Sequence, residues 1–390
     1  MSALPSNRDE NWKYANLRAL ARIRFDDTSA PPTDEAAALI AALPPSSQSH
    51  TRVVLIDGHL AVEASGTSPF MRFDTARRSL ANAAPRGGAD ADRYFARLNQ
   101  QHAPGTLVIE VPAGAELDLE LWLAAARIGH PSVHIRLGDG ARVQLVERVL
   151  ASQHAPSLAS NLHLLIDCGI NARLALTRVQ TFSANHQHVE TLDLTLGKAA
   201  ECELIQITSG GHSSRSSAFV THAGGVSRLH WNVAMLARAT QVHDAYVRIA
   251  HESNQAHTVQ RFRGIGTERS RLAFNGHMQV AAGTRDVRTE QSLKGLLAGG
   301  EAEIDLRPQL EIHADAVQAA HGATLGKLDA DMLFYLLSRG IPPAQAESLL
   351  KWAFISDVLR HLPTPTVRRQ VEELLIELLP GSAAARAEGV

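Results

Sequence analysis

The side chains best suited to chemistry in this 390-residue chain are its 19 histidines and two cysteines. His186 and His188 lie two positions apart, so on an extended strand both imidazoles share one face and could bind a metal ion. Paired polar residues are also common on strand faces, and we favour that structural interpretation. Cys168 and Cys202 are far apart in the sequence, which predicts packing residues rather than a disulfide or a metal cage.

His321 lies in the stretch Ala319-Ala320-His321-Gly322-Ala323-Thr324-Leu325-Gly326, where predicted strands give way to predicted helices. Neutral imidazole is a ligand for iron, zinc or copper, and the adjacent glycine lets a backbone approach closely. A His-Gly pair is also ordinary turn material. The residues alone therefore leave a metal ligand and a turn residue as open alternatives.

Several catalytic signatures are missing from the sequence. It contains no GxxxxGK[ST] phosphate loop, which predicts that this chain does not hydrolyse ATP itself. His251-Glu252 is not followed by the second histidine of a zinc-protease helix, and Gly211-His212-Ser213 lacks the second glycine of a nucleophile elbow. We interpret the serine-rich residues 213–217 as a strand edge or loop.

Composition and charge indicate a globular protein. Hydrophobic residues make up 45% of the chain and charged residues 20%, which excludes wholesale disorder. The net charge of −2 is too small to indicate a nucleic-acid or anionic-membrane partner. Charged residues near the N-terminus replace the apolar core of a signal peptide, and no apolar run is long enough for a membrane span. We expect a soluble, cytoplasmic protein.

Turn residues recur at a nearly constant spacing in the middle of the chain. They stand between alternating apolar runs, with successive separations of 26, 29, 28, 27, 29 and 30 residues: Gly114, Gly140, Gly169, Gly197, Gly224, Ser253-Asn254 and Gly283. A two-strand repeat cannot bury its apolar face alone, but stacked coils of a β-solenoid can. An antiparallel sandwich also has short strands and frequent turns. The even spacing favours the solenoid.

The ends of the chain show other patterns. Before the repeats we predict a helix near 34–43, a hairpin around Asp57-Gly58 and a helix near 89–101. The expected organisation is a mixed helical region over 1–104, a solenoid core over 105–310, a helical domain over 311–381 and a flexible tail over 382–390.

The predicted C-terminal domain contains three helices. Asp329 is placed to cap a helix over 330–339, and Gly340 suits the left-handed residue past its end. A second, amphipathic helix is expected over 343–361, and a third from about Val367.

A set of short motifs in the C-terminal half has a specific counterpart among known proteins. The motifs are Arg263-Gly264-Ile265, Phe274-Asn275-Gly276, Gln291 to Leu297, Arg307 to Ile312, Ala314-Asp315, His321 to Gly326 and Leu333 to Ile341, with Glu10 to Leu17 near the N-terminus. In these segments the chain resembles the SufB/SufD family of iron–sulfur cluster assembly proteins, and it is most similar to the SufD branch.

The resemblance implies a right-handed parallel β-helix between helical ends, which agrees with the repeat. It implies a non-catalytic scaffold subunit, not an enzyme, that pairs with a SufB-like paralogue and binds a SufC-like ATPase through its C-terminal helical domain. When isolated, the chain could instead form a homodimer through its edge strands.

The resemblance also implies a role for His321 as the ligand that this chain offers to a nascent iron–sulfur cluster. The cluster would be transient and shared with the partner, so the isolated chain is expected to hold none tightly. Many SufD-like chains carry a cysteine two positions earlier, where this chain has Ala319, which offers no thiolate. Because imidazole binds iron only when unprotonated, acid pH is expected to weaken cluster retention.

For the ATPase contact we predict the helix over 343–361. Its apolar anchors are Leu349, Leu350, Trp352, Phe354 and Ile355. Trp352 and Ile355 are expected to face outward.

Two alternative functions are compatible with a β-solenoid. A carbohydrate-active solenoid enzyme, such as a pectin lyase-like protein, would need carboxylates clustered on successive coils. The acidic residues of this chain do not recur at the 28-residue step. The other alternative is a purely structural interaction module.

Overall fold

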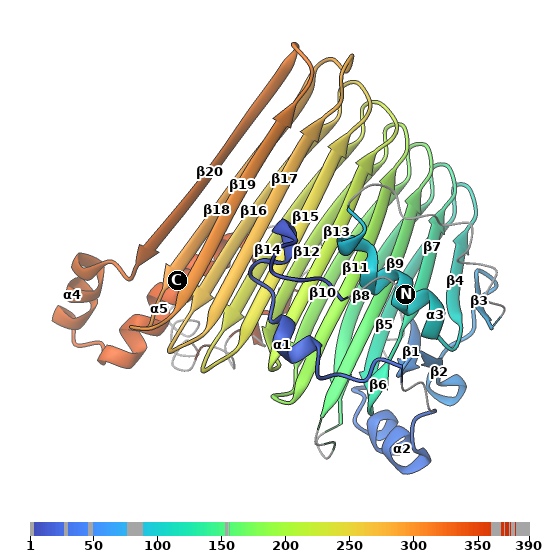
Figure 1. Cartoon of the computed structure of the whole chain (residues 1–390), viewed down its shortest axis with the longest axis horizontal. Helices are drawn as coiled ribbons and strands as arrows, with labels where there is room; N and C mark the ends of the chain where they lie inside the picture. The colour runs from blue at the N-terminus through green and yellow to red at the C-terminus, as the bar shows by residue number, and fades with distance from the viewer. Residues whose placement is uncertain are drawn as a thin grey trace.

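The computed structural model describes residues 4–26, 30–45, 50–75, 89–152, 155, 157–359, 368–369, 371–373, 375 and 379. The chain winds into a parallel β-helix, and each coil contributes one long strand to each of two facing sheets, here called sheet A and sheet B (Figure 1). Helices from the N-terminal and C-terminal parts pack against the outside of the solenoid.

Each sheet has ten strands within the described residues. Sheet A consists, in spatial order, of β2 (His59–Leu60), β1 (Thr51–Ile56), β5 (Glu116–Ala125), β8 (Arg142–Ala151), β10 (Arg173–Phe182), β12 (Glu201–Gly210), β14 (Arg228–Ala237), β16 (His257–Gly266), β18 (Val287–Leu297) and β20 (Val317–Lys327). Sheet B consists of β19 (Glu303–Ile312), β17 (Arg271–Val280), β15 (Val242–His251), β13 (Ser213–His222), β11 (His186–Leu196), β9 (Leu158–Cys168), β7 (Ser132–Leu137), β4 (Thr106–Val111) and β3 (Met71–Asp74), with β6 (Ile128–Gly129) beside β9.

The strand register confirms the repeat. Arg173 of β10 lies opposite Glu201 of β12, 28 positions later in the sequence, so this coil takes 28 residues. Neighbouring coils pair in parallel along both sheets. A sandwich of antiparallel strands is therefore excluded, and the predicted parallel β-helix is confirmed.

Alternation along each strand separates an inner face from an outer face. On β10, Leu174 and Leu176 point into the core between the sheets, whereas Val179 packs outward against the C-terminal part of the chain. The inner apolar residues of successive coils stack on one another from Val53 to Ile304 and form one continuous core. Burial of this ladder drives stacking, because no single coil could remove its apolar face from water.

The turn glycines meet two physical requirements, which are the close approach of stacked turns and a positive φ. A Cβ atom on Gly197 would lie 2.6 Å from the carbonyl oxygen of Cys168 in the preceding turn. The left-handed backbone conformation in these turns is also taken by other residues, such as Asn171 with φ 54°. The glycine spacing therefore marks two requirements. Close contact between coils applies at Gly169, Gly197 and Gly224, and a positive φ applies at Gly114, Gly140 and Gly283.

The N-terminal region is joined to the solenoid rather than separate from it. β1 and β2 form the predicted hairpin, with positive φ at both Asp57 and Gly58. β1 also pairs in parallel with β5, and β3 pairs with β4, so both sheets begin before residue 105. The predicted helices are present as α2 (Thr33–Ala41) and α3 (Tyr94–His102), and short 3-10 turns form η2 (Val62–Ala64) and η3 (Ala91–Arg93).

The first residues cross the outer face of sheet B as an N-terminal strap, defined here as residues 10–20 with η1 (Glu10–Trp12) and α1 (Leu17–Leu20) (Figure 1). Trp12 is 1% exposed, and its indole Nε1 donates to Asp92 at 3.1 Å. The Arg215 guanidinium of β13 lies over the indole, 4.2 Å from the ring centroid. The strap therefore binds the outer face of the middle coils.

Replacing Trp12 by Phe is expected to lower the free energy of unfolding by about 1–3 kcal/mol, because the buried Asp92 carboxylate loses a hydrogen-bond donor. Urea unfolding of the purified chain measures the change. Tyr14→Phe, which removes a hydroxyl from a half-buried ring beside Lys13, is the control and should unfold like the parent. Equal midpoints for the two variants would contradict a stabilising role for the Trp12–Asp92 bond.

The solenoid continues further toward the C-terminus than the sequence analysis placed it. β19 and β20 occupy residues expected to begin the helical domain at 311. Pro308 does not end the strands. It lies within β19, at the edge of sheet B, where a missing backbone N–H is tolerated. One further coil therefore precedes the helices.

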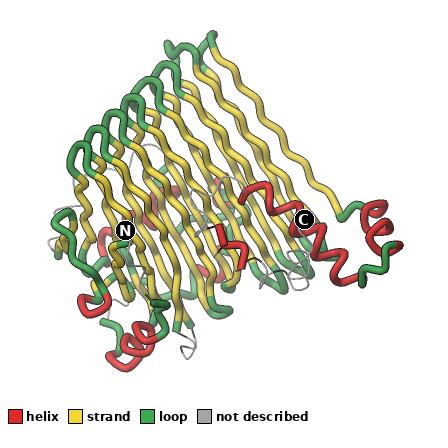
Figure 2. The backbone as a smooth tube through the Cα atoms, turned by 180° about the vertical axis from the view of Figure 1, so that it is seen from behind, coloured by secondary structure: helices red, strands yellow, loops and turns green. Residues whose placement is uncertain are grey.

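Two helices follow β20, namely α4 (Ala330–Ser338) and α5 (Pro343–Leu359). Asp329 caps α4 as predicted, accepting from the backbone N–H groups of Asp331 and Met332, and Gly340 has φ 82°. α5 lies on the outer face of sheet A (Figure 2), where Arg263 of β16 donates to Asp357 at 2.6 Å. The third predicted helix and the tail fall largely or wholly outside the described residues. Among the described helices, none has both the length and the apolar character needed to span a membrane.

Candidate functional site

His321 lies in β20, the last strand of sheet A. Its Cα is paired with that of Gln291 on β18, which in turn is paired with Gln260 on β16. Gln260 and Gln291 are buried and share the alternation of the inward-facing Phe262 and Leu293. His321 therefore continues an inward-facing row of polar residues, but it is exposed because it stands in the terminal coil.

The terminal coil ends both sheets. β19 and β20 are the last strands of their sheets within the described residues, so each has one edge without a neighbouring strand. Ile312 and Leu325 are 41% and 48% exposed at this end. Unpaired edges and exposed apolar side chains are features of a surface to which another chain can add strands.

Ala319 lies on the same inward-facing side of β20 as His321, and it is paired with Thr289 of β18. Its methyl group cannot bind a metal, so the only first-row metal ligand that this short segment offers is the imidazole. The described residues contain no group of three or more His, Cys, Asp or Glu side chains placed to hold a metal ion.

The cysteines lie in the apolar core, as packing residues do. Cys168 and Cys202 are both buried and unbonded to each other. Burial raises the pKa of Cys168 to about 12, and burial also raises that of Cys202 well above its ordinary value. The thiolate is the form that binds metals and acts as a nucleophile, so both buried thiols are expected to be unreactive.

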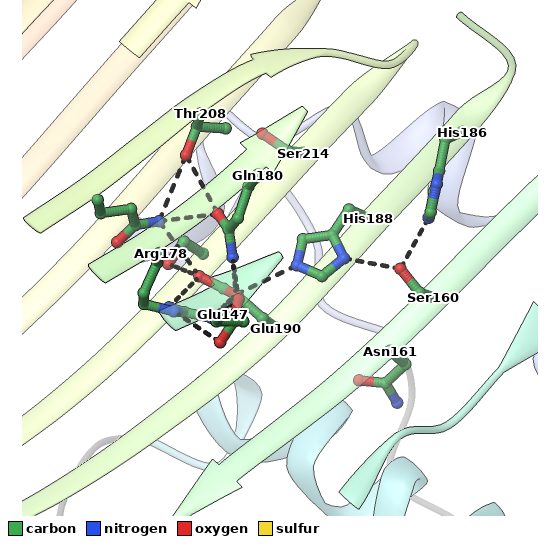
Figure 3. Close-up of polar contacts among 12 residues, drawn as sticks. Glu147, Ser160, Asn161, Arg178, Gln180, His186, His188, Glu190, Thr208 and Ser214 are labelled. Atoms are coloured by element: carbon green, nitrogen blue, oxygen red, sulfur yellow. Dashed lines mark hydrogen bonds and ion pairs between the residues drawn. The ribbon is translucent and has the colours of Figure 1, made fainter. Parts of the chain in front are cut away.

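A second polar cluster lies inside the middle coils (Figure 3). At its centre, the fully buried guanidinium of Arg178 donates to Glu147 at 2.9 Å and to Glu190 at 2.6 Å. Gln180 donates to both carboxylates as well, at 3.1 and 2.8 Å. These residues come from β8, β10 and β11, so the cluster joins sheet A to sheet B across the interior.

His186 and His188 belong to the same interior cluster. The hydroxyl of Ser160 lies 2.8 Å from His186 Nε2 and 2.7 Å from His188 Nδ1, and His188 Nε2 lies 3.2 Å from Glu190 (Figure 3). Burial lowers the pKa of His186 to about 3. The two histidines share a strand face, as predicted, but that face is the inner one, where both nitrogens of His188 and Nε2 of His186 are within hydrogen-bond distance of neighbouring side chains.

Direct contacts with Arg178 stabilise the two buried carboxylates of this cluster. Burial alone would raise the pKa of Glu190, but the charge of Arg178 and hydrogen bonds from His188 and Arg178 hold that pKa well below its usual range. Both carboxylates are enclosed and paired with one guanidinium. They form an internal ion network and not the open acidic cleft that a carbohydrate-active enzyme would need.

The predicted partner anchors are less exposed than the sequence suggested. Ile355 was expected to face outward, but it is fully buried against sheet A. Trp352 and Phe354 are partly buried against the same cluster, and Leu349 and Leu350 are half-buried. The error arises because α5 is apolar on several faces, so spacing alone does not tell which face meets the solenoid.

The exposed apolar surface lies instead on α4, which the sequence analysis did not select. Its four large exposed side chains are Met332, Phe334, Tyr335 and Leu337, with Phe334 72% exposed. α4 has no buried residue and projects beside the terminal coil (Figure 1). The sequence signal that could have found it is a run of six large apolar or aromatic residues, 332–337, in a nine-residue helix, which is more than one buried face requires.

Comparisons with known proteins place these features in context. The family model for the SufBD core domain of SUF system FeS cluster assembly matches residues 122–354. The chain is 28% identical over 395 residues to an iron–sulfur cluster assembly SufBD family protein of Synechocystis, covering 95% of this chain and 86% of that protein. It is 26% identical over 400 residues to the iron–sulfur cluster assembly protein SufD of Escherichia coli, covering 98% and 91%. It is 23% identical over 396 residues to protein ABCI7, chloroplastic, of Arabidopsis thaliana, covering 96% and 82%.

Proposed function

Because this chain belongs to the SufB/SufD family of iron–sulfur cluster assembly proteins, we propose that it acts as the SufD-type scaffold subunit of a SufBCD-type complex. In this function the chain catalyses no reaction. It takes part in assembly of the cluster, which is cargo, by presenting one ligand and by docking two partner proteins. The cytoplasm is the compartment in which we expect the complex to work.

The observation that carries this proposal is the position of His321. Its imidazole stands in the terminal coil, beside two strand edges, and is exposed where a second chain would pack. A single neutral imidazole can donate one lone pair to iron, so a cluster held here needs further ligands from the second chain. The nascent cluster is therefore shared and transient, and the isolated chain binds none tightly.

The partner at the terminal coil is proposed to be a SufB-like paralogue. β19 and β20 offer backbone N–H and C=O groups at both sheet edges, and a related solenoid could continue the sheets from them. In the absence of that partner, a second copy of this chain could use the same edges.

The proposed contact for the SufC-like ATPase is the exposed apolar face of α4 and the adjoining part of α5. Phe334 is the central anchor because it is the most exposed large apolar side chain of α4. Trp352 and Phe354 contribute only through their uncovered parts, and Ile355 contributes no direct contact while α5 stays on sheet A.

Replacing His321 by Ala in the complete complex is expected to reduce cluster retention at least tenfold. In other metal sites, removing a residue that only hydrogen-bonds to a metal ligand already lowers metal affinity about 10- to 100-fold. The measurement is iron and acid-labile sulfide content after anaerobic reconstitution. His212→Ala, at an exposed turn between β12 and β13, is the matched control. Equal iron and sulfide in the His321 variant and the parent would remove this histidine from the proposed site.

A further inference from the structure

Gln260, Gln291 and His321 form the inward-facing row of polar residues described above, and the row is called the amide file below. The three residues are paired in register on β16, β18 and β20. Because neighbouring strands lie about 4.8 Å apart, side chains on one face of successive coils lie within reach of each other. Gln260 and Gln291 are 0% and 2% exposed, so the file leads from the solenoid interior to the exposed imidazole.

The one hydrogen bond between the two amides leaves an acceptor, Gln291 Oε1, and a donor, Gln260 Nε2, buried without partners among the described residues. Gln291 Nε2 donates to Gln260 Oε1 at 2.6 Å. Gln291 Oε1 is buried and has no hydrogen-bond partner among the described residues. A buried carbonyl without a donor costs free energy, so a donor in the adjacent strand would stabilise this arrangement. In register, the side chain next to Gln291 on β20 is that of His321.

Gly276 on β17 makes room for the file from the opposite sheet. A Cβ atom at this position would lie 2.1 Å from Gln291 Nε2 and 3.0 Å from Gln260 Oε1. Any larger residue would displace the amides. Gly276 therefore leaves the space in which the two glutamines can lie side by side between the two sheets.

We propose that Gln291 is a positioning residue for His321, accepting a hydrogen bond from one ring nitrogen through its amide oxygen. The N–H of the imidazole then stays at the nitrogen facing Gln291, and the lone pair stays on the other nitrogen, which is available to iron. The bond to iron rests on the proposed function; the hydrogen bond does not. This is the role that outer-shell acceptors have toward metal-binding histidines in general.

An amide is chemically suited to this position. A carboxylate at 291 would also accept from the ring, but it would add a buried negative charge beside the apolar Leu293. An amide accepts without charge. Gln260 Oε1 accepts from Gln291 Nε2, and this hydrogen bond orients the Gln291 amide and its unpaired oxygen.

The test reads the imidazole directly, in the full-length chain without iron. Ring ¹⁵N chemical shifts of His321 are assigned from the signals lost in His321→Ala. One tautomer is expected in the parent. Gln291→Met, which keeps the side-chain length but removes the acceptor, should give a mixture of both tautomers, and Gln291→Glu should restore one. Gln309→Met, which removes an amide bonded to Asn275 on β17, is the matched control.

Unchanged tautomer populations in Gln291→Met, with unchanged circular dichroism, would overturn the proposal. If Gln291→Met fails to fold, a mixed tautomer in Gln291→Glu would overturn it instead. In the complete complex, Gln291→Met is expected to lower cluster retention 10- to 100-fold, with recovery in Gln291→Glu. A tautomer change without loss of cluster would support the hydrogen bond and contradict the role of His321 in the proposed function, so the two failures are distinguishable.

Discussion

Acidification from pH 7 to pH 5 is expected to unfold this protein over a narrow range, because five imidazoles are buried in neutral form. They are His130, His186, His222, His243 and His251. Burial lowers the pKa of His130, His243 and His251 to about 4 and that of His186 to about 3, and it also lowers that of His222 well below its usual value.

The sign of the effect follows from proton uptake on unfolding. A histidine whose folded pKa lies below its unfolded value binds more protons in the unfolded chain, so its contribution to stability is complete above about pH 6.5 and is lost as pH falls toward about 4. Each such group changes the free energy of unfolding by up to about 1.4 kcal/mol per pH unit in this window. Burial raises the pKa of Asp57, Asp244 and Asp305, which opposes the trend, but these are three groups against five.

Urea unfolding at pH 7, 6 and 5 measures this slope. His243→Gln should reduce it by up to about 1.4 kcal/mol per pH unit, since one proton-binding group is removed. His212→Gln, at an exposed turn, is the control and should leave the slope unchanged. A protein equally stable at pH 7 and pH 5 would show that the buried rings do not set the acid limit.

The solenoid could be predicted from sequence because its physical cause is periodic. Turns need glycine where stacked coils approach closely, as at Gly169 and Gly197, or where φ is positive, as at Gly140, and one of these two requirements recurs in most coils. The Asp329 cap and the Asp57-Gly58 hairpin are local and were predicted for the same reason. The contacts of the N-terminal strap were not predictable, since Glu10 pairs with Arg307 across most of the chain length.

The position of His321 was predictable only in part. Its segment was identified by resemblance, but its inward-facing register beside Gln291 depends on strand pairing. The interior ion network was missed because charged residues in strands usually mark an outer face. The alternation of side chains along the strand could have indicated it. Arg178 follows Leu174 and Leu176 at two-residue steps and therefore lies on the same inner face.

Arg178→Met is expected to lower the free energy of unfolding by about 3–5 kcal/mol, the cost of leaving a buried charge without its partner. The methionine fills much of the volume, so the loss is mainly electrostatic. Glu147 and Glu190 would then face each other inside the solenoid, without the guanidinium that donates to both carboxylates.

A triple variant distinguishes the effect of the three charges from the effect of side-chain packing. Adding Glu147→Gln and Glu190→Gln to Arg178→Met removes all three charges, and this triple variant should recover much of the lost stability, since neutral replacement of a whole buried network is often tolerated. Arg228→Met breaks an exposed pair with Glu201 and should cost less than about 1 kcal/mol. Urea midpoints at pH 7 compare all four proteins. If the triple variant is as unstable as Arg178→Met, the charges are not the cause, and the shape of the arginine side chain holds the two sheets together instead.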